Sequence, residues 1–392
     1  MSIKTCHNVT DFRRLARRRL PAPMFHYIDG GADDEWSLVN NTEAFDRYQF
    51  RPRYLRDVSR GNLGTQVMGA QMQMPLFLSP TGMSRLFHHG KEIAVARAAQ
   101  KAGVMYSLST LGTASLEEIA EISDGPKMFQ IYVLRDRALV REFIARCKSA
   151  GYTSLCLTVD TPLAGNRERD HRTGMTMPPR FSLSSALSFA AHPHWAFNLL
   201  RDPNFLLANV AHRADALGKG AMGLIQYVND QLDRSVTWDE AAWVAEEWGG
   251  PFCIKGLQTA EDAQRAVEIG ATAIMISNHG GRQLEGAPAP IDCVRPMRDA
   301  VGDAVELIVD GGVRRGTHVL KALALGANAC SFGRPYLYGL AAAGEAGVSR
   351  VLDLMRAEIQ RGLALLGETH IQDVGEQHIE AVAGLPAPKF TK

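Results

Sequence analysis

The stretch Ala271-Thr-Ala-Ile-Met-Ile-Ser-Asn-His-Gly-Gly-Arg282 joins a short apolar run to a histidine, two glycines and an arginine. The apolar run, residues 271–276, is typical of a buried strand. His279 can take up a proton near neutral pH, and Arg282 offers a planar fork for a carboxylate. The stretch therefore predicts a strand that ends in a base and an anion clamp, as proton abstraction from an organic acid requires. A tight turn with a surface histidine is the alternative.

Apolar, often β-branched runs of the same kind recur from residue 75 onward. They cover residues 75–79, 103–108, 127–133, 153–159, 252–255, 271–277, 305–309 and 328–332. Helical patterns lie between most of them, and several end at a glycine, as helix C-termini prefer. Eight strand–helix units predict an α/β fold of the (β/α)8 TIM barrel type. A doubly wound open sheet is less well supported, because no Gly-x-Gly-x-x-Gly fingerprint opens its first helix.

The chain is expected to form one domain, residues 1–392, with the barrel from about 75 to 345. An N-terminal helical segment should precede it, with helices at Asp11–Leu20 and Pro23–Ile28. The spacing between the fourth and fifth strands is far longer than the others. Residues from about 175 to 235 therefore form an insertion, which we expect on the catalytic face of the barrel.

Composition and charge give no indication of a nucleic-acid-binding, secreted or membrane-spanning protein. Apolar residues make up 46% of the chain and charged residues 22%, which is ordinary for a soluble globular protein. The net charge of +1 implies no general attraction to nucleic acid. No cysteine forms a Cys-x-x-Cys pair, and Cys156, Cys253 and Cys330 lie in apolar runs, so we expect reduced core cysteines and a reducing compartment. No secretory signal and no membrane-spanning run is visible.

Catalytic residues of a barrel gather where its strands end, at the C-terminal face. Any one polar residue there has an ordinary structural explanation, but the joint pattern of an amide, hydroxyls, a lysine, a base and carboxylates favours a site. The strand ends carry Pro80-Thr81-Gly82, Ser109, Gln130, Tyr132, Thr158, Asp160, Lys255, Ser277, His279, Asp310 and Gly333-Arg334.

Two glycine–arginine loops predict a phosphate site. Asp310-Gly311-Gly312-Val313-Arg314-Arg315-Gly316 follows the seventh strand and leads into a helix, and Gly333-Arg334 follows the eighth. These loops form the usual phosphate site of the barrel, with backbone N–H groups and arginine charge facing the anion. The pattern does not separate a phosphorylated substrate from a phosphorylated cofactor.

Lys255 favours a flavin as the phosphorylated group. A lysine at the end of a buried strand is a Schiff-base nucleophile, a fixed positive charge or a partner of a carboxylate. Gln130, Thr158 and Ser277 are small hydrogen-bonding groups suited to the edge of a flat heterocycle. A cation beside a flavin ring stabilises its anionic reduced form.

Several of these motifs resemble one known family, the FMN-dependent L-2-hydroxy acid dehydrogenases and oxidases, which include glycolate oxidase, L-lactate dehydrogenase and mandelate dehydrogenase. The resemblance runs in the expected order from about residue 8 to 370 and implies FMN as cofactor, with no metal. The motifs are Phe-Gln-Ile-Tyr (129–132), Thr-Val-Asp (158–160), Ile-Lys-Gly (254–256), Ser-Asn-His-Gly-Gly-Arg-Gln (277–283), Asp-Gly-Gly-Val-Arg-Arg-Gly (310–316) and Gly-Arg-Pro (333–335).

The resemblance implies a role for each candidate residue. His279 is the active-site base, and Asp160 pairs with its imidazolium. Arg282 clamps the substrate carboxylate with help from Tyr27 and Arg167. Tyr132 bonds the substrate oxygen, and Lys255 neutralises the reduced flavin. The flavin ring and ribityl chain are lined by Pro80, Thr81, Gly82, Ser109, Gln130, Thr158 and Ser277. The ribityl and phosphate groups are held by Asp310, Gly311, Gly312, Arg314, Gly333 and Arg334.

Two positions bear on the substrate. Leu111 stands where glycolate oxidase has a tryptophan, and Gly82 stands where several members have alanine. Both changes remove bulk, so a glycolate-only enzyme is disfavoured. The tracts Gln130–Asp136 and His192–Trp195 look most similar to bacterial respiratory L-lactate dehydrogenases.

The resemblance therefore predicts oxidation of an L-2-hydroxy acid, with L-lactate to pyruvate as the first choice and a quinone or cytochrome as acceptor. Whether His279 removes the α-proton or the hydroxyl proton is left open. A mandelate-type dehydrogenase, an oxygen-using oxidase and a non-catalytic phosphate-binding barrel are the alternatives. The family suggests a homotetramer. The similarity to respiratory L-lactate dehydrogenases suggests a cytoplasmic protein on the inner face of the cell membrane.

The insertion is rich in apolar and aromatic residues, but every run is too short to span a bilayer. It contains 181–190, 192–201 and 205–210, punctuated by Arg180, Arg201, Arg213 and Lys219. Such a segment can lie in a membrane interface with its apolar face buried. A lid over the barrel mouth that packs on a neighbouring subunit is the alternative, and disorder is a third.

Overall fold

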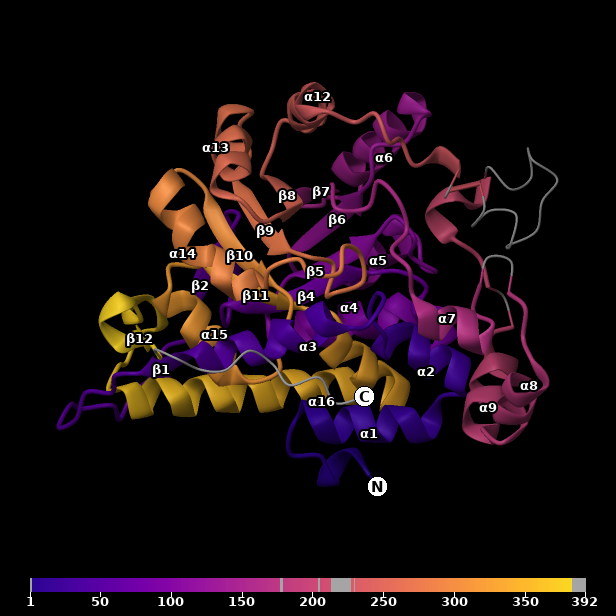
Figure 1. Ribbon diagram of the computed structural model, residues 1–392, viewed down its shortest axis with the longest axis horizontal. Helices are drawn as coiled ribbons and strands as arrows, with labels where there is room; N and C mark the ends of the chain where they lie inside the picture. Colours follow the sequence, from indigo (N-terminus) through magenta and orange to yellow (C-terminus); the bar gives the residue numbers. More distant parts are fainter. Residues whose placement is uncertain (1, 177–178, 204, 213–226, 229, 383–392) are drawn as a thin grey trace.

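Eight parallel strands close into a barrel at the centre of the molecule (Figure 1). The computed structural model describes residues 2–176, 179–203, 205–212, 227–228 and 230–382. The strands pair in chain order, and the last returns to the first, so the predicted TIM barrel is confirmed. Their bounds are β4 (Leu76–Thr81), β5 (Tyr106–Ser109), β6 (Lys127–Ile131), β7 (Ser154–Thr158), β8 (Phe252–Leu257), β9 (Ala273–Ser277), β10 (Glu306–Asp310) and β11 (Ala329–Phe332).

Helices surround the barrel and bury their apolar stripe against the strands, as their sequence periodicity predicts. Each predicted helix is present to within two residues, and Gly103 ends α4 with a positive φ of 64° as a left-handed C-cap. The helices after the strands are α4 (Lys91–Ala102), α5 (Leu116–Ile122), α6 (Arg137–Ser149), α12 (Trp238–Trp248), α13 (Ala260–Glu268), α14 (Pro290–Val301), α15 (Gly316–Ala324) and α16 (Arg334–Leu366).

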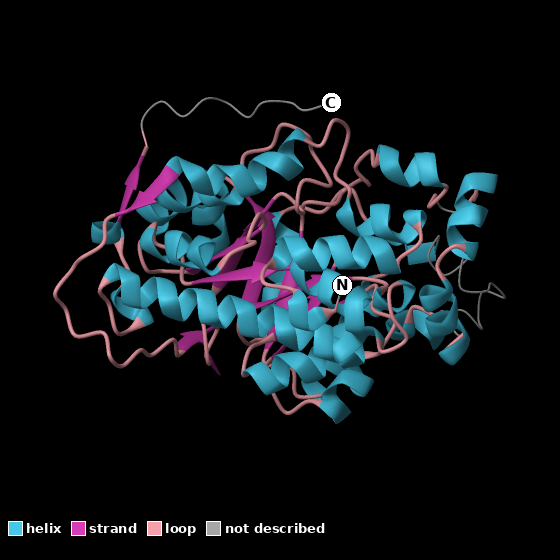
Figure 2. Ribbon diagram, turned by 90° about the horizontal axis from the view of Figure 1, so that it is seen from below, coloured by secondary structure: helices cyan, strands magenta, loops and turns pink. Residues whose placement is uncertain are grey.

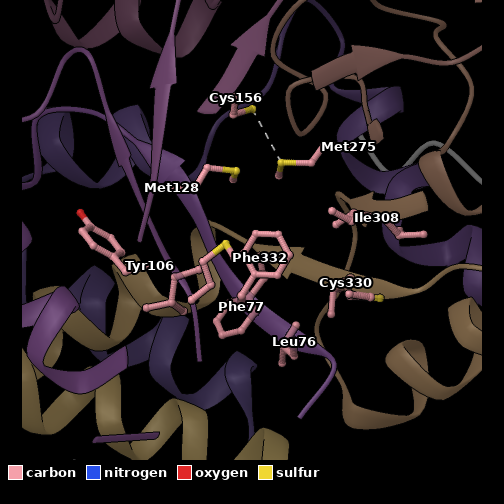
Figure 3. Close-up of a cluster of buried hydrophobic side chains, with 14 of the residues drawn as sticks. Leu76, Phe77, Tyr106, Met128, Cys156, Met275, Ile308, Cys330 and Phe332 are labelled. Carbon is pink, nitrogen blue, oxygen red and sulfur yellow. Dashed lines mark hydrogen bonds between the residues drawn. The ribbon is translucent and has the colours of Figure 1, made fainter. Parts of the chain in front are cut away.

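Fully buried side chains from several strands fill the barrel interior (Figure 3). Phe77, Met128 and Phe332 fill space beside a sulfur contact between Cys156 and Met275, whose Sγ and Sδ atoms lie 4.0 Å apart. All six cysteines are free and buried, in agreement with the expected reduced core. Side chains thus fill the described barrel interior, as is usual for this fold.

The N-terminal segment runs along the outside of the barrel and reaches its catalytic end. Helix α1 (Val9–Arg19) packs against α16, and α2 (Ala22–Asp29) and α3 (Trp36–Glu43) follow (Figure 1). The view of Figure 2 shows helices around the central strands. Short elements complete the chain: strands β1 (Tyr48–Phe50) with β12 (Ile379–Ala381), the hairpin β2 (Thr65–Val67) with β3 (Ala70–Met72), and the 3-10 helices η1 (Ile3–Thr5), η2 (Ala44–Arg47), η3 (Ser84–Leu86), η4 (Ala208–Val210), η5 (Ile371–Asp373) and η6 (Glu376–His378).

The insertion after β7 carries α7 (Glu168–Thr173), α8 (Leu183–Ala190) and α9 (Pro193–Arg201). Helix α8 packs against α2, and the indole of Trp195 on α9 donates a hydrogen bond to the Leu86 carbonyl at 2.7 Å. The α8–α9 pair is therefore held against the N-terminal segment and the loop after β4. The predicted basic residues Arg213 and Lys219 lie outside the described residues. In the described ranges no helix combines the length and the apolarity needed to cross a bilayer.

Candidate active site

A cavity of about 420 Å³ opens at the C-terminal end of the barrel, among the loops that follow the strands. Most of the residues expected at the site line this one cavity, although they come from distant parts of the chain. They are Tyr27, Pro80, Thr81, Gly82, Ser109, Leu111, Tyr132, Arg167, Lys255, His279, Arg282, Asp310, Gly311, Gly312, Arg314, Gly333 and Arg334.

His279 sits directly after β9 in the left-handed backbone region, with φ of 57°. A side chain at positive φ is uncommon and costs free energy, so such residues mark constrained positions. Gly280 and Gly281 continue the left-handed turn with φ of 68° and 70°, and a Cβ on Gly280 would lie 2.6 Å from Arg334 Nη1. The two glycines therefore let the backbone turn beside an arginine while His279 faces the cavity.

The imidazole of His279 is paired with a carboxylate. Its Nδ1 lies 2.9 Å from Asp160 Oδ1, so the Nδ1–H donates to Asp160 and leaves Nε2 as the free ring nitrogen. Burial lowers the pKa of His279 below its ordinary value, and this effect outweighs the opposing attraction of Asp160. The imidazole is thus neutral at neutral pH, which is the form that accepts a proton.

Lys255 of β8 lies between two buried carboxylates, that of Asp160 just after β7 and that of Asp310 at the end of β10. Its Nζ is 3.7 Å from Asp160 Oδ2 and 3.4 Å from Asp310 Oδ2, and it donates to Ser277 Oγ at 3.2 Å. Burial lowers the pKa of Lys255, but the two carboxylates outweigh it and hold that pKa above its ordinary value. The lysine is therefore a fixed cation. Three hydroxyls donate to Asp310: Ser79 at 2.6 Å, Ser331 at 2.7 Å and Ser277 at 2.9 Å.

Two arginines flank the ring of Tyr27 on the wall of the cavity. The guanidinium of Arg282 lies 5.2 Å from the ring centroid and that of Arg167 lies 5.5 Å from it. Burial and the neighbouring Arg167 lower the pKa of Arg282 to about 9. Arg167 Nε is 3.4 Å from Asp170 Oδ2, which is its acidic partner. Arg282 donates only to backbone carbonyls among the described residues, so its charge is available for an anionic ligand.

The loops after β10 and β11 fit the phosphate of FMN. Arg314 and Arg334 donate to backbone carbonyls, and neither makes an ion pair with a carboxylate in the part of the chain that the structure describes. Burial lowers the pKa of Arg314 to about 10 and lowers that of Arg334 as well, which a bound dianion would reverse. Gly312, with φ of 76°, admits the loop next to Asn41, where a Cβ would meet the Asn41 carbonyl oxygen. The residues present therefore suit the cofactor.

Four expected residues do not line this cavity: Asp160, Gln130, Ser277 and Thr158, of which Thr158 lines a neighbouring cavity of about 260 Å³. Gln130 accepts a hydrogen bond from Ser109 Oγ at 3.0 Å. Thr158 Oγ1 is buried and, like Ser84 Oγ and Ser107 Oγ, has no hydrogen-bond partner among the described residues. The orphaned Thr158 hydroxyl agrees with a polar heterocycle edge at the strand ends.

The structure adds residues that sequence reasoning missed. Ser79 and Ser331, which donate to Asp310, occupy inward positions of β4 and β11, and strand alternation next to known inward residues could have revealed them. Apolar residues of the insertion could not have been found this way, because no local pattern says where an insertion folds. Four residues of the insertion line the cavity together with Leu163 and Leu111, and these are Met175, Leu207, Val228 and Leu232.

Gly82 and Leu111 are in direct contact across the cavity wall. A Cβ on Gly82 would lie 2.8 Å from Leu111 Cβ, and Met83 N donates to the Leu111 carbonyl at 2.9 Å. The two positions that the sequence singled out separately therefore constrain each other, since a larger residue at either would press on the other.

Comparisons with known proteins show the family of the chain. The model of the family "FMN-dependent dehydrogenase" matches residues 16–381. A putative L-lactate dehydrogenase of Mycobacterium tuberculosis is 39% identical over 95% of this chain and 88% of its own, and an L-lactate oxidase of Nostoc sp. is 41% identical over 94% and 96%. Glycolate oxidase 3 of Oryza sativa subsp. indica is 40% identical over 95% of both chains.

Solved structures extend the comparison. The crystal structure of the monotopic membrane protein (S)-mandelate dehydrogenase superposes with a TM-score of 0.93 at 36% identity, over 96% of this chain and all of that one. A mandelate oxidase superposes with a TM-score of 0.82 at 35% identity, over 97% and 100%.

The charges around His279 predict opposite effects of two substitutions on its pKa. Asp160→Asn removes the attraction that opposes burial, so the pKa of His279 should fall further below its ordinary value. Lys255→Met removes a repelling cation, so that pKa should rise. NMR titration of ¹³C-labelled histidine, with the resonance assigned by its loss in His279→Gln, measures both. Shifts in the same direction in the two variants would contradict the arrangement.

Proposed function

The chain belongs to the family of FMN-dependent dehydrogenases, enzymes that oxidise 2-hydroxy acids, and on this premise we propose that it converts an L-2-hydroxy acid, with L-lactate as the first candidate, to the 2-oxo acid. The observation that carries this proposal is the paired base His279–Asp160 facing the same cavity as Arg282 and Lys255. Electrons then pass to a quinone or cytochrome.

Arg282 anchors the substrate in this proposal. Its planar fork suits a carboxylate, and its position beside Tyr27 and Arg167 gives the anion two cations and a phenol to face. The carbonyls that hold Arg282 in place leave it little freedom, so a bound carboxylate is fixed in one orientation. The 2-hydroxyl and the α-carbon are thereby directed toward His279.

His279 then takes one proton from the substrate at Nε2. The imidazolium that results is stabilised by Asp160, which already accepts the Nδ1–H at 2.9 Å. The bound FMN would supply the acceptor for the two electrons that leave the substrate in the oxidation. Lys255 is a permanent positive charge that would stabilise the reduced cofactor, and Tyr132, whose pKa burial raises to about 12, keeps its hydroxyl proton as a donor to the substrate oxygen.

Removing the base should separate chemistry from cofactor binding. His279→Gln should retain FMN, because the arginine loops are untouched, but reduce it with L-lactate about a thousandfold more slowly. Arg282→Lys, a point charge in place of a fork, should raise KM as well as slow reduction. Anaerobic stopped-flow bleaching of the flavin measures both. A histidine variant that loses FMN yet turns over normally per remaining flavin would refute the assignment.

A mandelate-type activity is the second candidate, and the wall of the cavity favours it. Leu111, Leu163, Met175, Leu207 and Leu232 offer apolar surface beyond what a methyl group needs. Two mandelate enzymes also superpose over nearly the whole chain. An aromatic side chain on the 2-hydroxy acid would gain burial against these residues.

A panel of hydroxy acids on the wild type and Leu111→Trp decides between these candidates. The wild type should use L-lactate well and glycolate poorly, since Leu111 leaves room that glycolate does not fill. Leu111→Trp should shift kcat/KM toward glycolate by about tenfold. Wild-type preference for glycolate would show that position 111 is wrongly interpreted, and preference for L-mandelate would favour the second candidate. Peroxide formed during turnover would identify oxygen as the acceptor.

The α8–α9 pair supplies a surface for the membrane, which we include in the proposal because a quinone acceptor resides in the bilayer. Leu183, Leu187 and Leu200 are 79%, 64% and 77% exposed, and Phe197 is 54% exposed. The exposed Arg201 packs over the Phe197 ring at 4.6 Å, as a basic side chain at a lipid interface would. Met175 and Leu207 of the same insertion line the cavity, so lid and membrane surface are one segment.

Three substitutions test the membrane surface without deleting the lid. Leu183→Glu, Leu187→Glu and Leu200→Glu combined should abolish cosedimentation with phosphatidylglycerol vesicles, because each places a charge where an apolar side chain would enter lipid. The matched control is Leu55→Glu with Leu365→Glu, two exposed leucines elsewhere on the surface. Flavin reduction by L-lactate should be unchanged in all proteins. Equal vesicle binding by both variants, or none by the wild type, would remove the membrane claim.

A further inference from the structure

Asp29, the last residue of α2, gathers donors from three other elements. Its side chain is only 2% exposed. It accepts hydrogen bonds from Arg13 Nε at 2.5 Å and Nη2 at 2.7 Å, from the Tyr338 hydroxyl at 2.8 Å and from Arg169 Nη1 at 3.1 Å. These partners lie on α1, α16 and α7, so one carboxylate ties the end of α2 to elements more than 300 residues apart.

The backbone around this carboxylate holds two arginines of the cavity. Arg282 Nη1 donates to the carbonyls of Tyr27 at 2.7 Å and Gly30 at 3.0 Å. Arg334 Nε donates to the Ile28 carbonyl at 2.9 Å, and its Nη2 donates to the Gly30 carbonyl at 2.7 Å. Backbone carbonyls without a partner at a helix C-terminus attract cations, so the end of α2 readily binds both guanidinium groups.

Asp29 also supplies negative charge behind the phosphate arginines. Burial raises its pKa, but the hydrogen bonds and charge of Arg13 prevail and lower that pKa to about 2, so it is ionised at neutral pH. Burial lowers the pKa of Arg314 and of Arg334, and the charge of Asp29 acts in the opposite direction on both. The carboxylate therefore favours the charged form of the arginines without occupying their ligand-facing side.

We propose that Asp29 is a positioning residue. By fixing the turn at the end of α2, it orients Arg282 for the substrate carboxylate and Arg334 for the FMN phosphate. The inference rests on the proposed function for its substrate half alone, since the FMN half requires only the cofactor. Asp29 touches neither ligand, and acts by fixing the carbonyls that orient the two arginines. A purely structural hub would stabilise the fold without affecting either ligand.

Asp29→Asn tests the proposal, with Glu368→Gln as a matched control. Glu368 is a buried carboxylate 2.5 Å from Arg56 Nη1 and 2.9 Å from His378 Nε2, and none of the three lines the cavity. Both variants should melt at lower temperature. Only Asp29→Asn should raise KM for L-lactate about tenfold with kcat within about threefold, and raise the FMN dissociation constant about tenfold, measured by flavin fluorescence on dilution of the holoenzyme.

Arg13→Gln covers the case in which Asp29→Asn does not fold. It removes the bidentate partner of Asp29 from a side chain that is half exposed, and should shift KM and FMN affinity in the same direction by a smaller factor. Loss of thermal stability with KM and FMN affinity equal to those of Glu368→Gln would overturn the proposal. If the wild type oxidises no 2-hydroxy acid, the substrate assignment fails, and FMN release still decides the role of Asp29.

Discussion

The buried cation Lys255 is the interaction on which the catalytic end of this barrel depends. A charge this deep is stable only when carboxylates and hydroxyls compensate it, because the cost of desolvating an isolated ion is large. Asp160 and Asp310 provide the two charges from β7 and β10, and serines of β4, β9 and β11 complete the shell around Asp310. Most strands of the barrel thus end in one polar network.

The same network links the buried cation to the histidine of the site. Asp160 contacts Lys255 with one oxygen and His279 with the other, so the cation and the base share a carboxylate. In the proposed reaction the shared charge would stabilise an imidazolium at His279, while burial keeps the imidazole neutral beforehand. A base that is neutral at rest and charged only during reaction is what proton transfer from a weak acid requires.

Two segments outside the barrel turn this scaffold into a specific pocket. The N-terminal α2 enters the catalytic end and presents Tyr27 together with carbonyls for two arginines. The insertion supplies apolar wall residues on the inside and exposed leucines on the outside. Part of the cavity wall therefore lies in segments that tolerate change more easily than barrel strands do, as loops on a rigid scaffold commonly allow.

The sequence by itself determined the barrel, its eight strands to within a few residues, and the polar residues at their ends. It could do so because strand and helix periodicities are local, and because parallel strands bring their C-terminal ends to one face. The resemblance implied the pair of Asp160 with His279, and the tertiary structure alone decided the other charge pairs. Lys255 lies between Asp160 and Asp310, Gly82 meets Leu111, and Asp29 lies between Arg13 and Tyr338. These contacts join residues 16 to 309 positions apart. Such pairings follow from distances in the folded chain, which no local pattern encodes.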